Sequence, residues 1–331
     1  MPQSFNPKFL MQRRKFIQRA GALALSPYMA QSLISCGSGN QQSEEKSSST
    51  SGDLSEFGIQ LWTVKEDMAA DPKGTLSKIA SAGYNYVESF GGDKGPFWGM
   101  TAAEFKAVLD DLGMRIVASH VDAAYTTDLA REEEFKTLAY EAASIGMKYL
   151  SNPFPGEIQT KEEWMAVAEG LNRQGIICAS NGIKAGYHNH HFEFLPLEDG
   201  TLPYNLLLDN TDPDLVDFEL DLYWAVKAGQ DPEKWLNEHG TRIKLCHVKD
   251  LAKPERMAEI DKEEGPAEGF WPLQYSCVLG TGQIDYPKIL KTARDNGMEY
   301  YIVEQERFDG SNPLADAALD AEYMKSFRFA S

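Results

Sequence analysis

Cysteine is scarce in this chain of 331 residues, and basic residues are outnumbered by acidic ones. The three cysteines in the body of the chain, an odd number, lie among apolar residues: Cys178, Cys246 and Cys277. This pattern argues against a disulfide framework and predicts buried thiols. The 32 Lys and Arg residues face 50 Asp and Glu residues, which gives a net charge of -18. Because such a chain repels nucleic-acid phosphates, we expect no nucleic-acid partner.

A long hydrophobic run is also missing. The apolar segment 20–34 is short and is interrupted by Ser26-Pro27, so it cannot span a bilayer as a permanent helix. It follows the pair Arg13-Arg14 and ends in Leu33-Ile34-Ser35-Cys36, which resembles a bacterial lipobox. Residues 1–35 are therefore predicted to be a twin-arginine-type lipoprotein signal peptide, with Cys36 lipidated. The alternative is a disordered basic tail that contains a chance cysteine.

The predicted signal implies export to the periplasm or outer membrane of a Gram-negative bacterium, with membrane contact only through the lipid anchor at Cys36. Residues 36–53 are rich in Ser, Gly and Gln and contain no large apolar side chain. Such a segment cannot form a core, so we expect a flexible tether. The folded part should begin near Leu54 and comprise residues 54–331 as one domain.

One short pattern recurs along this domain: a helix-like segment, then a glycine, then an apolar run. Five copies contain Gly83, Gly113, Gly146, Gly182 and Gly297. The glycine is expected to end the helix in the left-handed conformation, and the apolar run to form a strand buried on both faces. Thr101, Thr160 and Asp285 are the predicted N-caps of three of these helices.

Three further strand-like runs, 57–62, 216–220 and 243–246, bring the strand number to eight. Eight strand and helix units in about 250 residues predict a single α/β domain, a (β/α)8 TIM barrel. The competing doubly wound sheet is disfavoured, because no G-x-G-x-x-G follows the first strand.

The carboxyl ends of the strands form the working face of this fold. The residues there are polar or aromatic: Gln60 and Trp62, Glu88, His120, Asn152, His188, Asp221, His247 and Glu304. The last four end adjacent strands, and two imidazoles with two carboxylates suit one divalent ion, foremost Mn²⁺, with Zn²⁺ or Co²⁺ as alternatives. They are the predicted metal ligands. There are two alternatives: each of the four residues only caps its strand, or His190 replaces His188 as the ligand.

Several motifs resemble those of the xylose isomerase-like barrel superfamily, in particular its sugar phosphate isomerase/epimerase group. The match covers roughly residues 55–330 and is carried by these segments: Gly58-Ile59-Gln60-Leu61-Trp62, Gly186-Tyr187-His188-Asn189-His190, Leu220-Asp221-Leu222-Tyr223-Trp224, Cys246-His247-Val248-Lys249-Asp250, Leu279-Gly280-Thr281-Gly282 and Val303-Glu304-Gln305-Glu306. The resemblance favours Asp221 over Glu219 as the ligand on the sixth strand.

The resemblance implies a metal-dependent isomerase or epimerase that forms an enediolate from a sugar. In related epimerases, glutamates on the fifth and eighth strands transfer the proton. Glu304 fits the eighth-strand role, but His188 occupies the fifth-strand position. The predicted catalytic residues are therefore Glu304 with Lys249 or His190, and Glu88 is a further candidate. Substrate contacts are expected from Trp62, Glu88, His120 and Trp224.

Export predicts an unphosphorylated sugar or keto-sugar as the substrate, because sugar phosphates are rare outside the cytoplasm. The alternatives to an isomerase or epimerase are a lyase or hydrolase of 3-keto glycosides on the same metal site, and a non-catalytic sugar-binding lipoprotein. The long segment 251–285 is expected to cover the mouth of the barrel or to contribute to a homodimer contact. The glycines of Gly280-Thr281-Gly282 either bind an anion or only shape a turn.

Overall fold

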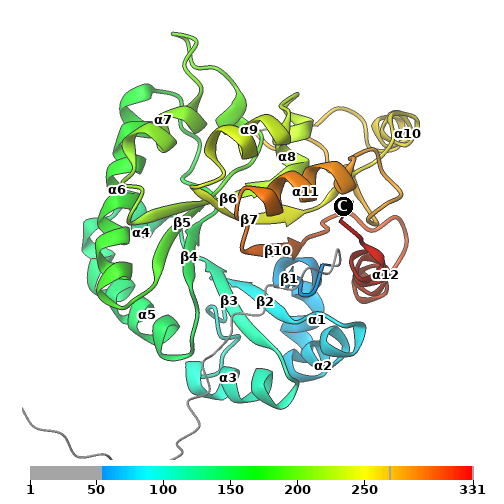
Figure 1. Ribbon diagram of the computed structural model, residues 1–331, viewed down its shortest axis with the longest axis horizontal. Helices are drawn as coiled ribbons and strands as arrows, with labels where there is room; N and C mark the ends of the chain where they lie inside the picture. The colour runs from blue at the N-terminus through cyan, green and yellow to red at the C-terminus, as the bar shows by residue number, and fades with distance from the viewer. Residues whose placement is uncertain (1–53, 268–269, 330–331) are drawn as a thin grey trace, which may run out of the picture. The chain divides into compact units, whose positions relative to one another are not determined.

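The computed structural model describes residues 54–267 and 270–329, and this part of the chain contains a closed barrel of parallel strands (Figure 1). The order of the strands around the barrel is β1, β10, β7, β6, β5, β4, β3 and β2. Their bounds are β1 Gly58–Gln60, β2 Tyr86–Phe90, β3 Arg115–His120, β4 Tyr149–Asn152, β5 Lys184–His188, β6 Val216–Asp221, β7 Ile243–Val248 and β10 Tyr300–Val303. The predicted eight-stranded barrel is confirmed. The predicted signal and tether, 1–35 and 36–53, lie outside the described residues.

Helices surround the barrel, and most of them connect consecutive strands. Their bounds are α1 Lys65–Ala70, α2 Pro72–Ala82, α3 Ala102–Asp111, α4 Ala124–Thr127, α5 Glu132–Ser144, α6 Lys161–Ser180, α7 Pro203–Asn210, α8 Leu222–Lys227, α9 Pro232–His239, α10 Pro254–Glu264, α11 Tyr286–Asp295 and α12 Pro313–Ser326. Within the described ranges, none of them has the length and apolar character needed to cross a membrane.

The recurring glycines end their helices as predicted. All five have positive φ angles: Gly83 105°, Gly113 68°, Gly146 88°, Gly182 75° and Gly297 85°. Only glycine adopts this conformation without strain, which is why the same residue recurs where each helix turns into a strand.

Two of the three predicted N-caps are confirmed in full. Thr101 and Thr160 accept hydrogen bonds from the backbone of Glu104 and Glu163, whose carboxylates bond back to the caps. Asp285 does precede α11, but its side chain makes no capping hydrogen bond. The prediction was therefore right about where this helix begins and wrong about the cap interaction.

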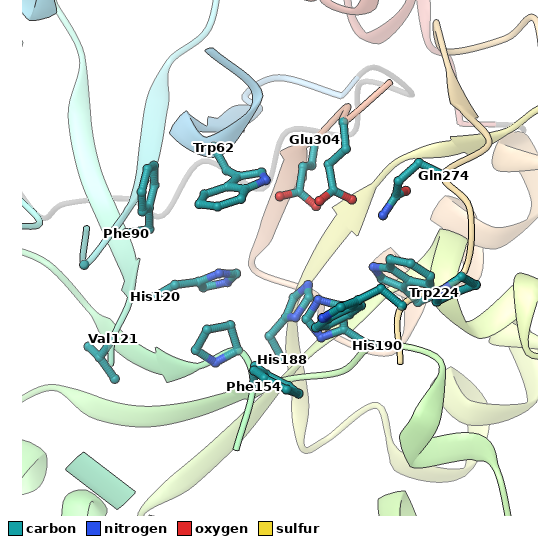
Figure 2. A pocket seen from close by; sticks show the side chains of 15 residues that line it. Trp62, Phe90, His120, Val121, Phe154, His188, His190, Trp224, Gln274 and Glu304 are labelled. Atoms are coloured by element: carbon teal, nitrogen blue, oxygen red, sulfur yellow. The ribbon is translucent and has the colours of Figure 1, made fainter. Parts of the chain in front are cut away.

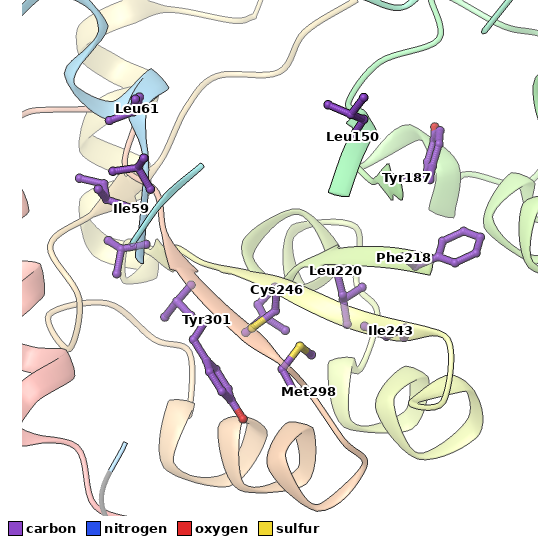
Figure 3. Close-up of a cluster of buried hydrophobic side chains, with 14 of the residues drawn as sticks. Ile59, Leu61, Leu150, Tyr187, Phe218, Leu220, Ile243, Cys246, Met298 and Tyr301 are labelled. Atoms are coloured by element: carbon purple, nitrogen blue, oxygen red, sulfur yellow. The ribbon is translucent and has the colours of Figure 1, made fainter. Parts of the chain in front are cut away.

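Strand alternation separates the core from the site. Leu220 and Phe218 on β6 belong to the large apolar core under the helices (Figure 3), whereas the alternating residues Glu219 and Asp221 do not. A second, smaller apolar cluster includes Tyr86, Ala118, Leu245 and Ile302 from four other strands. Two positions further along the same strand faces lie Glu88, His120, His247 and Glu304. Each strand thus passes from an apolar layer into a polar one at its carboxyl end.

The segment between β7 and α11 is folded around Asp250. The short strands β8 (Asp250–Leu251) and β9 (Ser276–Cys277) pair antiparallel, and α10 lies between them in sequence. Asp250 Oδ2 accepts hydrogen bonds from the backbone of Gly280 and Gly282, each at 3.0 Å. These glycine N–H groups bind a carboxylate of the chain itself, so they are not a site for a substrate anion.

Candidate active site

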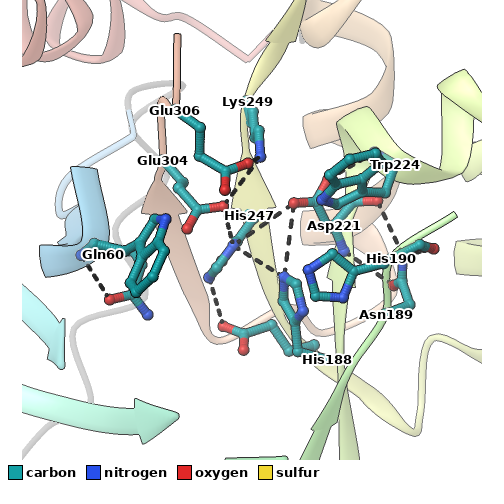
Figure 4. Close-up of polar contacts among 12 residues, drawn as sticks. Gln60, His188, Asn189, His190, Asp221, Trp224, His247, Lys249, Glu304 and Glu306 are labelled. Atoms are coloured by element: carbon teal, nitrogen blue, oxygen red, sulfur yellow. Dashed lines mark hydrogen bonds and ion pairs between the residues drawn. The ribbon is translucent and has the colours of Figure 1, made fainter. Parts of the chain in front are cut away.

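Four side chains at the ends of neighbouring strands bring their donor atoms together (Figure 4). His188 Nε2 lies 3.1 Å from His247 Nδ1, which lies 3.2 Å from Glu304 Oε2. Asp221 Oδ2 lies 3.6 Å from His188 Nε2 and 3.7 Å from His247 Nδ1. The four residues predicted as metal ligands are thus adjacent in space.

The spacing and chemistry of these atoms fit one divalent ion. Atoms bound to a common ion at about 2.0–2.3 Å lie about 3–4 Å apart, as these do. Asp221 Oδ2 is buried and receives no hydrogen bond from any described residue. A buried carboxylate oxygen without a partner is costly unless a cation binds it. Two nitrogens and two carboxylate oxygens suit Mn²⁺, Zn²⁺ or Co²⁺.

The surrounding charges favour a positive charge at this place. Burial lowers the pKa of His247, but Glu219 and Glu304 outweigh burial and raise it well above its ordinary value. Burial raises the pKa of Glu304, yet Lys249 and His247 hold it well below the ordinary range. Burial and the neighbouring His247 lower the pKa of His188. An ionised Glu304 and a neutral His188 are the forms in which these side chains bind a metal ion.

Hydrogen bonds fix both the side chain and the backbone of Asp221. Its Oδ1 accepts a hydrogen bond of 2.8 Å from the backbone N–H of Trp224, so it caps α8 while Oδ2 remains near the histidines. The side chain of Asn189 accepts from the backbone N–H of Asp221 at 3.1 Å and donates to its carbonyl at 3.4 Å. These contacts would hold Asp221 in place as a metal ligand, because they fix its position relative to the other donor atoms.

His247 is supported from behind by Glu88, which the sequence predicts as a substrate contact. Glu88 is fully buried and does not line the cavity; its Oε2 lies 2.7 Å from His247 Nε2 and accepts from Gln60 at 2.9 Å. A carboxylate behind a ligating histidine fixes its tautomer and its ring orientation. Glu88 would therefore position His247, which lies between Glu88 and the other three donor atoms.

A cavity of about 540 Å³ opens beside the four donor atoms (Figure 2). This volume lies within the range of about 300–1,000 Å³ typical of small-molecule sites. The predicted substrate contacts Trp62, His120 and Trp224 line the cavity, as do His188, Glu304 and His190. The other lining residues are Phe90, Gly91, Val121, Pro153, Phe154, Trp271, Pro272, Gln274 and Glu306.

The segment 251–285 reaches the cavity, as one of its two predicted roles requires. Trp271 and Gln274 lie on the cavity wall. The indole of Trp271 lies 4.8 Å from the ring of His190 and 5.1 Å from that of Phe154, measured between ring centroids. The sequence analysis did not single out Trp271 or Phe154, because neither falls at a strand end.

Lys249, predicted to be catalytic, lies behind the cavity wall. It is fully buried, and its Nζ contacts Glu304 Oε2 at 3.4 Å and the carboxylate of Glu306. Both glutamates line the cavity, so Glu306 lies at the cavity wall where Lys249 was expected. Glu306 is two residues after Glu304, a spacing that puts both on one side of an extended chain. That spacing is the sequence signal by which Glu306 was identifiable.

His190 reaches the cavity, whereas His191 does not. Burial lowers the pKa of His190 well below its ordinary value, so the ring is neutral. The backbone N–H of His190 donates to Glu193 at 2.9 Å, and burial raises the pKa of Glu193 to about 8. His190 is thus placed against the substrate space by a buried acid of its own segment.

The family described as "xylose isomerase-like TIM barrel" matches residues 76–327. The chain belongs to the xylose isomerase-like TIM barrel family. An inosose dehydratase of Clostridium perfringens is 27% identical over 274 residues, which are 76% of this chain and 88% of the relative. A solved sugar phosphate isomerase/epimerase from Parabacteroides distasonis is 29% identical, with a TM-score of 0.69, over 86% of this chain and 98% of its own.

More distant members of the xylose isomerase-like fold share the barrel alone. A solved L-ribulose 3-epimerase is 14% identical, with a TM-score of 0.59, over 81% of this chain and 92% of its own. The relatives that match most of this chain bear the names of enzymes, a dehydratase and an isomerase/epimerase. Family and cavity together indicate an enzyme with a small-molecule substrate.

Proposed function

We propose that the protein is a divalent-metal-dependent lyase of an unphosphorylated keto-sugar. It removes a proton from the carbon beside the carbonyl and expels an oxygen substituent from the next carbon. The observation that carries the proposal is a pair of neighbouring carboxylates, Glu304 and Glu306, whose pKa values are shifted in opposite directions on one side of the cavity.

The opposite shifts assign a base and an acid. Lys249 and His247 hold Glu304 ionised, whereas burial raises the pKa of Glu306 although Lys249 opposes it. Two titratable groups whose environments separate their pKa values are the usual arrangement for paired acid and base catalysis. Glu304 therefore suits the role of general base, and Glu306 suits the role of general acid.

Glu304 takes the proton from the carbon beside the carbonyl, and the electron pair of that C–H bond forms a C=C bond. The C–O bond at the next carbon breaks, and its electron pair leaves with the oxygen. Glu306 protonates that oxygen, so the products are an unsaturated ketone and water or an alcohol. Lys249 contacts both carboxylates and holds them beside each other.

The metal ion would be held by His188, Asp221, His247 and Glu304. When bound, it supplies a Lewis acid that stabilises negative charge on the substrate carbonyl oxygen. Trp62 and Trp224 offer indole faces for the apolar side of a sugar ring, and His120 supplies a polar contact on the cavity wall (Figure 2).

The lining of the cavity favours an unphosphorylated substrate. Two glutamates line it, and none of the described lining residues is a lysine or arginine. Phosphate recognition ordinarily uses such cations or free backbone N–H groups. The N–H groups of Gly280 and Gly282 are engaged by Asp250. A phosphate beside Glu304 and Glu306 would be repelled.

An isomerase or epimerase is the second candidate, favoured by His190. Epimerisation needs a second proton-transfer group on the other face of the enediolate, and His190 is a neutral imidazole on the cavity wall. The solved relative named a sugar phosphate isomerase/epimerase is consistent with this activity. Both candidates share the first proton removal, so the fate of the enolate distinguishes them.

The test is incubation of the Mn²⁺-loaded protein with cyclic keto-sugars and keto-glycosides in D₂O, followed by NMR and mass spectrometry. We expect a product lighter than the substrate by water or an alcohol. A product of unchanged skeleton with one deuterium on carbon would support the second candidate instead. If an added sugar stabilises the protein but neither product forms, both candidate activities are overturned and the result indicates a sugar-binding protein.

Two variants test the base and acid assignments separately. Glu304→Gln should abolish both deuterium exchange and elimination, because the base is lost. Glu306→Gln should retain exchange of the α proton but slow elimination by about 10²–10⁴-fold, the usual contribution of a general acid. Equal loss of exchange and elimination in Glu306→Gln would contradict the assignment.

A further inference from the structure

A second group of potential ligands lies on the other side of His247. It consists of Glu88, His120, Glu219 and His247, with one donor atom from each within 4.8 Å of the others. His120 Nε2 lies 2.9 Å from Glu219 Oε2 and 3.4 Å from Glu88 Oε2. The proposed lyase mechanism uses His247 as a metal ligand and His120 as a substrate contact. It assigns no role to Glu219, which the sequence analysis set aside in favour of Asp221.

The two glutamates have more acceptor oxygens than the cluster has donors. Glu88 Oε2 receives both Gln60 Nε2 and His247 Nε2, and Glu219 Oε2 receives His120 Nε2. Glu88 Oε1 and Glu219 Oε1 are buried and receive no hydrogen bond from any described residue, although His247 Nε2 lies 3.3 Å from the latter. Both glutamates are 0% exposed. Two unpartnered carboxylate oxygens at this depth are costly.

The charges are also unbalanced. Over residues 54–267 and 270–329, the ion-pair partners of Glu88 and Glu219 are His120 and His247 alone. Both partners are imidazoles, and no lysine or arginine of the described ranges pairs with these two side chains. A divalent cation beside the unpartnered oxygens would balance two buried carboxylates.

We infer that Glu88, His120 and Glu219 form a second divalent-cation site, separated from the first by the imidazole of His247. Glu88 Oε1, a Glu219 oxygen and His120 Nε2 are its ligands, while the Nε2–H of His247 continues to donate to Glu88 Oε2. One nitrogen and two carboxylate oxygens suit Mn²⁺ or Zn²⁺.

The second site goes beyond the proposed lyase activity but reaches the same cavity. His120 is the member of the group that lines the cavity, and the three-ligand set leaves room for water or a substrate oxygen. An ion there would give the protein a two-metal centre that contacts a substrate from both sides of His247.

Equilibrium dialysis against Mn²⁺, followed by elemental analysis, tests the inference. We expect about two equivalents in the wild-type protein and one in Glu219→Gln, which removes a ligand of the second site only. Asp221→Asn should also retain one equivalent, held by the second site. Glu193→Gln is the matched control, because Glu193 is equally buried but lies outside the cluster; it should retain two.

One equivalent in the wild-type protein at saturating Mn²⁺ overturns the inference and indicates that a proton shared by the glutamates balances the charge. Two equivalents in Glu219→Gln overturn it as well. If circular dichroism shows that Glu219→Gln does not fold, His120→Gln is used in its place. His120 lies at the cavity edge, and this variant should also bind about one equivalent. Turnover by wild-type protein that binds only one ion at saturating Mn²⁺ would refute the second site and leave the lyase proposal intact.

Discussion

Single side chains that never reach the cavity hold the proposed ligands in place. Asn189 is the clearest case, since it is fully buried and bonds both backbone groups of Asp221. Glu88 supports His247 in another way, because its carboxylate contacts the ring nitrogen Nε2. The geometry of the four donor atoms therefore depends on residues that a list of ligands omits.

Replacing Asn189 should loosen Asp221. We expect Asn189→Ala to lower Mn²⁺ affinity by about 10–100-fold, the usual effect of removing such a supporting contact. Isothermal titration calorimetry measures the change. Asn210→Ala is the control, because Asn210 bonds a carbonyl within α7, and it should bind Mn²⁺ like the wild type. Unchanged affinity in Asn189→Ala would refute the supporting role.

Asp320 on α12 should make stability depend on pH. Burial raises its pKa to about 8, whereas an unfolded Asp titrates near about 3.9. The folded state therefore binds more protons between these values, and the free energy of unfolding falls as pH rises from about 4 to 8. Asp320→Asn keeps an acceptor for the backbone N–H of Leu279 and removes the titration.

Urea unfolding at pH 5 and pH 9 checks this expectation. The wild-type protein should lose more stability between the two pH values than Asp320→Asn, and the variant should be the more stable of the two at pH 9. Equal losses in both proteins would show that Asp320 does not titrate in this range.

At the scale of elements, the glycines that end helices were predictable because their role depends only on the local backbone. Gly182 shows this most simply: its φ is 75°, and a Cβ added there meets no atom within 4 Å. A substitution at Gly182 therefore tests conformation without steric contact.

Gly182→Ala should lower the free energy of unfolding by about 1–2 kcal/mol, the cost of the left-handed conformation for a residue with a Cβ. Gly182→Asn should cost less, because Asn tolerates that conformation better. Urea unfolding of the two variants measures the difference. Equal costs, or no cost for Ala, would contradict the conformational explanation.

Helix α12 was not identified from the sequence, because it buries Asp316 and Asp320 and its apolar periodicity is therefore weak. Strand ends were predictable because alternation and the fold place them at the cavity. Whether a side chain reaches the cavity wall or lies behind it was not predictable, because this depends on packing between strands that are far apart in sequence. Lys249 and Glu88, both expected at the cavity, lie one layer behind it for this reason.

At the scale of the whole molecule, the barrel occupies only the part of the chain after the predicted tether. We propose that the N-terminal segment exports the protein and anchors it through Cys36. Cys36→Ser should shift the protein from the membrane fraction to the soluble fraction of the producing cell. Arg13→Lys with Arg14→Lys should retain it in the cytoplasm. Membrane association that survives Cys36→Ser would refute the anchor.

We propose that His188, Asp221, His247 and Glu304 bind one divalent cation at the mouth of the barrel. Crystals of the Mn²⁺-loaded protein, with data collected at the manganese absorption edge, test it most directly. The prediction is an anomalous peak about 2.0–2.3 Å from His188 Nε2, Asp221 Oδ2, His247 Nδ1 and Glu304 Oε2. Fully loaded crystals without a peak among these four atoms would contradict the claim.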